Sequence, residues 1–101
     1  MMDTRELYEV LRNLGTVDNA DSFSNLFGYG DSTIRSQFAK GISPDLGAWV
    51  RFWFALNEIA NDTKSAIKTA LNEERSEYFA GLEELRKLQT RVWQHVVELA
   101  S

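Results

Sequence analysis

The chain has 101 residues, of which 44% are apolar and 26% are charged, and its one Pro and six Gly exclude a collagen-like or low-complexity protein. Fifteen acidic and eleven basic residues give a net charge of −4, which excludes binding to nucleic acid or anionic membranes through bulk positive charge. The absence of Cys excludes disulfides, a thiolate nucleophile and a Cys-based zinc site, and the length suits one compact body.

The first predicted element is a short helix over residues 4–14. Its apolar residues recur at helical spacing: Leu7, Val10, Leu11 and Leu14. Asp3 and Glu6 are spaced as in a capping box, and Gly15 follows as a C-terminal cap would. Two shorter helices follow, over residues 20–27 and 31–40. Gly28 separates them, Asp31 is the predicted cap of the second, and Gly41 ends it.

A longer helix is predicted to begin at Ser43-Pro44-Asp45, with Ser43 as the cap and Pro44 in the first helical position. Apolar residues occur nearly all round this helix between Leu46 and Ala60, which is typical of a central helix buried on several sides. We expect a first domain over residues 1–61 and a helical dimerisation segment over residues 62–101.

The C-terminal segment has an apolar heptad pattern. Its seam consists of Leu71, Tyr78, Leu82, Leu85, Val92, Val96 and Leu99, with Arg75 and Gln89 at two further seam positions. A single helix from Lys64 to Ala100 would be about 55 Å long at 1.5 Å per residue, so we expect a break near residues 72–75 or at Gly81, or a projecting helix that meets a partner. The pattern leaves two arrangements open. In one, the seam forms a homodimer through Leu82, Leu85, Val92, Val96 and Leu99; in the other, it packs back on the chain's own aromatic helix.

The segment from Ala20 to Gly41 resembles the helix-turn-helix of the phage repressor and Cro superfamily. Five apolar residues match the positions that lock the two helices together: Phe23, Phe27, Tyr29, Ile34 and Phe38. Gly28 stands at the turn and Ser24 in the small-residue position. The resemblance implies an all-α, repressor-like helix-turn-helix bundle, here followed by a long C-terminal helix.

The resemblance also implies a duplex DNA interface on the third helix, where Arg35 suits a guanine edge and Gln37 an adenine edge. The candidate DNA-binding residues are Ser32, Thr33, Arg35, Ser36, Gln37 and Lys40, with Ser22 as a phosphate contact. The expected function is that of a homodimeric, sequence-specific repressor from a phage or mobile element, acting in the cytoplasm.

A different class of function remains open, because residues 20–41 hold as many anions as cations. The alternative is a small acidic module that binds a host protein as an adaptor or inhibitor. DNA binding gains if the cations converge on one face: Arg12, Arg35, Lys40 and Arg51. A protein partner gains if acidic residues dominate that face: Asp18, Asp21 and Asp31.

Other chemistry is not indicated. His95 is the only His, no Ser has an evident base, and no Gly-rich loop follows a strand. The most apolar stretch, from Leu46 to Leu56, is interrupted by Arg51 and is shorter than the ~20 residues of a membrane span. We therefore expect no enzyme activity, no cofactor, no metal and no membrane association.

Overall fold

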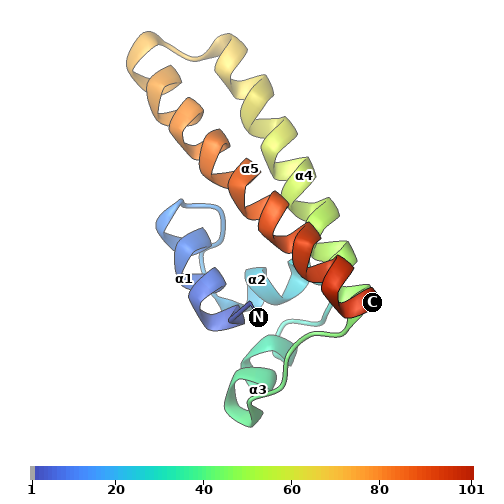
Figure 1. Ribbon diagram of the computed structural model, residues 1–101. Coiled ribbons are helices and arrows are strands. Elements are labelled where there is room, and N and C mark those ends of the chain that lie inside the picture. The colour runs from blue at the N-terminus through green and yellow to red at the C-terminus, as the bar shows by residue number, and fades with distance from the viewer. Residues whose placement is uncertain (1) are drawn as a thin grey trace.

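The computed structural model describes residues 2–101, and this part of the chain is all-α (Figure 1). It contains five helices and no strand. The helices are α1 (Thr4–Asn13), α2 (Ala20–Leu26), α3 (Thr33–Lys40), α4 (Leu46–Thr69) and α5 (Asn72–Ala100). The predicted all-α class and the long C-terminal helix are therefore confirmed. No helix among the described residues combines the length and apolarity needed to cross a bilayer.

The first helix forms as its periodicity predicts. The Asp3 side chain caps α1 by accepting from the Arg5 amide at 2.9 Å, and Leu7 and Leu11 are buried on its inner face. The helix ends one residue earlier than expected, and Gly15 follows its C-cap. The local signals of α1 thus agree with its packing.

The start of α4 differs from the prediction. Asp45 rather than Ser43 is the N-cap, and its side chain accepts from the Ala48 amide at 2.8 Å. Pro44 lies before the helix rather than in its first turn. The helix then runs without interruption for 24 residues, so the expected boundary between residues 61 and 62 falls inside α4.

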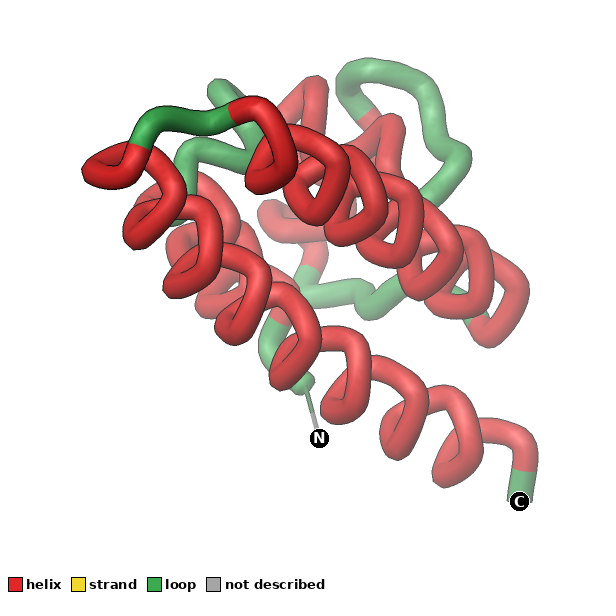
Figure 2. Tube along the Cα trace, turned by 90° about the horizontal axis from the view of Figure 1, so that it is seen from above, coloured by secondary structure: helices red, strands yellow, loops and turns green. Residues whose placement is uncertain are grey.

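The two long helices form an antiparallel hairpin (Figures 1 and 2). The helix is interrupted at Ala70 and Leu71, immediately before residues 72–75, where the sequence predicts a break. Gly81, the alternative position, lies within α5. Residues 71–80 are all exposed at the outer end of the hairpin. Folding the segment back keeps the longest dimension of the molecule at 44 Å.

The heptad seam packs inside the chain, which is the second of the two arrangements left open by the sequence. Leu85, Val92 and Val96 are buried in one core with residues of α1, α2 and α4. They are therefore not available to a second copy in this structure. Leu82 is half-buried and Leu99 is exposed, so the five proposed dimer residues do not form one accessible surface.

Buried Gln89 explains the polar interruption of the seam. Its Nε2 donates to Asn57 Oδ1 of α4 at 3.1 Å, and its Oε1 accepts from Arg86 at 2.8 Å. The side chain thus joins α5 to α4 within one chain. A polar contact of this kind favours one register of the hairpin over others.

The core beneath α2 and α3 is a cluster of aromatic rings. Phe27 stacks on Phe52 with ring centroids 4.3 Å apart, and the edge of Trp49 meets Phe27 at 5.2 Å. Phe23 completes the cluster, and all four side chains are fully buried. This packing fixes α2 against α4.

The expectation that α4 is buried on several sides is wrong for one face. Trp49, Phe52 and Leu56 point into the core, but Phe54 is 57% exposed and Leu46, at the start of the helix, is exposed as well. Seen from above, α1, α2 and α3 all lie behind the hairpin, so no helix among residues 2–101 covers its opposite side (Figure 2).

Candidate nucleic-acid interface

The turn between α2 and α3 depends on Gly28, as the sequence predicts. Its φ is +78°, in the left-handed region that L-residues with a Cβ rarely adopt. A Cβ at this position would also lie 2.7 Å from Cδ of Arg51, whose side chain covers the turn from α4. The backbone conformation favours glycine, and a Cβ would in addition require the flexible end of the Arg51 side chain to shift.

Ser24 of α2 connects the two short helices. Its fully buried hydroxyl donates to the Gly30 carbonyl at 2.6 Å and accepts from the Ile34 amide at 3.2 Å. The Ile34 amide is one of the first N–H groups of α3, which have no partner within the helix. Ser32 is the N-cap of α3 but makes no side-chain cap bond, and the predicted cap, Asp31, lies one residue outside it. Ser24 therefore supplies the cap from the neighbouring helix.

The five apolar residues of the motif all contribute to packing. Phe23, Phe27 and Ile34 are fully buried, whereas Tyr29 and Phe38 are half-buried against the core. Phe38 faces α1, where the Arg5 guanidinium lies 5.4 Å from the centre of its ring. These contacts hold the inner side of α3 against the molecule.

The opposite side of α3 is open. Its exposed residues are spaced at helical intervals and form one stripe, which we call the outer face: Ser32, Arg35, Ser36, Ala39 and Lys40. In Figure 1, α3 lies at one end of the molecule, beyond the other helices. Three of the five side chains are small and two are cationic, so the face permits close approach of an anionic surface.

Two predicted contact residues lie off this face. Thr33 is half-buried, and Gln37 lies in a crevice with Asp3, Thr4 and Arg5 at the start of α1. The Oε1 of Gln37 is buried without a hydrogen-bond partner among the described residues. Gln37 therefore offers no free amide oxygen on the outer face. Ser22, the proposed phosphate contact, is half-buried in the first turn of α2.

The charges at the outer face are mixed. The Arg35 guanidinium lies 3.0 Å from the Asp21 carboxylate of α2, and both side chains are partly exposed. Of the other named cations, Lys40 shares α3 and Arg51 covers the turn, but Arg12 lies about two helical turns along α1 from Arg5. Neither the basic nor the acidic group dominates the surface.

Sequence reasoning missed two residues beside this surface. Arg5 donates to the Phe38 carbonyl near the end of α3 at 3.5 Å, and Ala39 is exposed on the outer face in the last turn of α3. The spacing of Ser32, Arg35 and Ser36 could have identified Ala39, since the same helical interval leads to it. No local signal links Arg5 to α3, which is 33 residues away in the sequence.

The structure offers no second chemical site of a familiar kind in residues 2–101. No three His, Asp or Glu side chains gather where they could hold a metal ion. His95 is buried, with its ring packed on the edge of Trp49 at 4.8 Å. Comparisons with protein families, curated proteins and solved structures gave no match. The candidate interface is therefore defined by its geometry alone.

Proposed function

We propose that the chain binds duplex DNA through the outer face of α3 and regulates transcription as a homodimer. The observation that carries the proposal is the bare outer face itself, which presents Arg35 and Lys40 among small side chains. An α-helix fits the major groove, and small residues beside a long cation let the helix approach the base edges. The resemblance of residues 20–41 to repressors agrees with this use, and implies repression at an operator of a phage or mobile element.

A rigid support favours the same proposal. Base readout needs side chains that are held in position before binding, because each disordered side chain must be ordered at a cost in free energy. Ser24 and Gly28 fix the angle between α2 and α3, and the aromatic core fixes α2 on α4. The outer face is thus presented by a stable scaffold.

The small number of cations makes the salt dependence a quantitative test. Arg35 and Lys40 can neutralise at most two phosphates per copy, so the slope of log K against log salt should be no steeper than about −2 per copy and about −4 per dimer. We expect specific duplexes to be retained measurably at low salt. Random duplexes should no longer be retained near physiological salt.

The test combines selection of bound fragments from genomic DNA with titrations over a salt series. Arg35→Ala should weaken binding to the selected duplex by about 1–3 kcal/mol and relax sequence preference at one position. Lys64→Ala, an exposed cation on α4 away from α3, is the matched control and should leave affinity within about twofold. If no duplex is retained at micromolar protein in low salt, the proposal fails.

A second candidate function is favoured by the ion pair at the interface. Asp21 neutralises Arg35, and the chain carries a net charge of −4, so the same face suits a protein partner better than a phosphate backbone if the pair persists. This candidate is the acidic adaptor or inhibitor of a host protein. Loss of partner binding in Arg35→Ala without any duplex binding by the unsubstituted chain would support it.

A further inference from the structure

The uncovered side of the α4–α5 hairpin presents large aromatic side chains. Phe54 of α4 is 57% exposed and Trp93 of α5 is 47% exposed, and Leu46 and Val97 extend the apolar surface toward one end of the hairpin. With about 200 Å² for a whole aromatic side chain, Phe54 and Trp93 each expose roughly 100 Å². Apolar patches of several hundred Å² on a small protein mark interaction sites.

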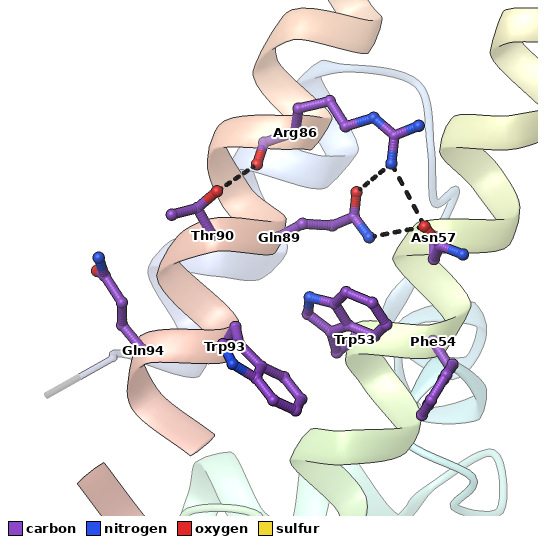
Figure 3. A pocket seen from close by; sticks show the side chains of 8 residues that line it. All are labelled: Trp53, Phe54, Asn57, Arg86, Gln89, Thr90, Trp93 and Gln94. Carbon is purple, nitrogen blue, oxygen red and sulfur yellow. Dashed lines mark hydrogen bonds between the residues drawn. The ribbon is translucent and has the colours of Figure 1, made fainter. Parts of the chain in front are cut away.

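A groove of about 820 Å³ lies between these aromatic residues (Figure 3). Trp53 packs between its walls, with its ring 5.0 Å from Phe54 and 5.4 Å from Trp93. The groove's volume lies within the range that accepts bulky apolar groups. We call this surface the groove face: Trp53, Phe54, Asn57, Arg86, Gln89, Thr90, Trp93 and Gln94.

The polar end of the groove face is already hydrogen-bonded within the chain. Asn57 Oδ1 accepts from Arg86 at 3.3 Å and from Gln89 at 3.1 Å, and Gln89 Oε1 accepts from Arg86 at 2.8 Å (Figure 3). Covering a polar group costs most when it loses its partners. These amides keep theirs under a cover, whereas the exposed Arg86 guanidinium has no carboxylate partner among residues 2–101 and must stay at the solvated rim of any contact, because burying an unpaired charge is costly.

The charge of the groove face suits a second copy of the same chain. Two copies with a net charge of −4 repel each other, but the groove face holds no carboxylate, and Arg86 is its one charged residue. Arg86 precedes Trp93 by two helical turns, about 10 Å along α5. A two-fold axis near Trp93 would therefore separate the two Arg86 residues by roughly 20 Å, well beyond the screening length at physiological salt.

The shape of the groove face also suits a two-fold contact. In such a contact one patch meets itself, so the same patch must contain both the protruding and the receiving parts. Phe54 and Trp93 are about half exposed, so each copy can offer them to the other, and the groove beside Trp53 has room for an aromatic side chain. Two antiparallel hairpins packed in this way form a four-helix bundle.

We propose that two copies of this chain associate through the groove face of the α4–α5 hairpin, and that the heptad seam has no part in the contact. The proposal deepens and rests on the proposed function, since a dimer presents two outer faces to one duplex. The patch is smaller than a standard interface, so the dimer is expected to dissociate in the micromolar range.

The experiment measures mass by sedimentation equilibrium from about 1 to 200 µM, without DNA. Phe54→Ser should raise the dissociation constant at least thirtyfold, because the side chain is lost from both copies. Phe79→Ser is the matched control, since Phe79 of α5 is 54% exposed outside the groove face, and should change the constant less than threefold.

A second pair of variants tests the charge argument without removing apolar surface. Thr90→Glu places a carboxylate on the groove face and should also leave a monomer, whereas Ser65→Glu makes the same change in charge on the exposed side of α4 and should not. A monomeric unsubstituted chain at 200 µM, or equal constants for Thr90→Glu and Ser65→Glu, would overturn the proposal. Sedimentation is measured without DNA, so its result is independent of duplex binding. If the chain forms a dimer but binds no duplex, only the proposed function is contradicted. If the chain is a monomer but binds a duplex, only the groove-face contact is contradicted.

Discussion

At Ser24 a single hydroxyl joins two helices and the turn between them. Ser24→Ala would leave the Ile34 amide buried with no partner in its place, and an unsatisfied buried donor costs about 1–3 kcal/mol. We expect a loss of that size in the free energy of unfolding, measured by urea titration. Ser36→Ala, on the exposed side of α3, should change it by less than about 0.5 kcal/mol. Equal losses in the two variants would show that the Ser24 bonds contribute nothing.

A comparison of Gly28 and Gly15 separates two costs of replacing a glycine: backbone strain at positive φ and steric overlap of the new Cβ. Both have positive φ, but a Cβ at Gly28 meets Arg51, whereas one at Gly15 meets nothing within 4 Å. Gly15→Ala should cost about 1–2 kcal/mol through backbone strain alone. Gly28→Ala should lower the free energy of unfolding by more than Gly15→Ala does, because the Arg51 side chain must also shift. When Arg51→Ala is added to Gly28→Ala, this extra loss should disappear. Thermal unfolding of the three variants checks this; equal melting temperatures for the two glycine variants would contradict it.

The start of α4 shows how far local signals identify a helix boundary. Ser43-Pro44-Asp45 contains two residues suited to an N-cap, and both fit common patterns, so sequence alone cannot choose between them. The structure chooses Asp45, two residues later. Asp45→Ala should therefore lower the free energy of unfolding by about 1 kcal/mol, whereas Ser43→Ala should leave it unchanged. Chemical denaturation distinguishes them, and the reverse order would place the cap at Ser43.

On the outer face of α3, the Asp21 carboxylate competes with DNA phosphate for the Arg35 guanidinium. Asp21→Asn would free Arg35 and remove one negative charge, so affinity for the selected duplex should rise roughly threefold to tenfold, equivalent to about 1 kcal/mol. The exposed pair contributes little to folding, so the free energy of unfolding should change by less than about 1 kcal/mol. Asp18→Asn, in the preceding loop, makes the same charge change without touching Arg35. An equal gain in both variants, measured by titration with duplex, would show that only net charge matters.

For the whole molecule, the sequence predicts where the helices lie along the chain better than it predicts which helices pack against each other. The periodicity of Leu7 and Leu11, and the glycines that follow each short helix, identify α1 to α3 nearly to the residue. The seam of Leu85 and Val92 looks the same whether its partner is another copy or α4, because an apolar stripe does not encode what covers it. The open side of α4 at Phe54 could not be predicted for the corresponding reason: an apolar residue on a helix does not reveal which face tertiary packing leaves open.

The position of Val92 in the fold yields a test of this internal packing. Val92 is fully buried and Val97 is half-exposed on the same helix. At about 0.5 µM protein, below the expected dissociation constant, Val92→Ala should lower the free energy of unfolding by roughly 2–3 kcal/mol through lost contacts and a residual cavity. Val97→Ala should lower it by less than about 0.5 kcal/mol. Because the core of a monomer does not depend on protein concentration, the urea midpoint of Val92→Ala should stay constant on further dilution. A midpoint that falls with dilution would instead place Val92 between two chains.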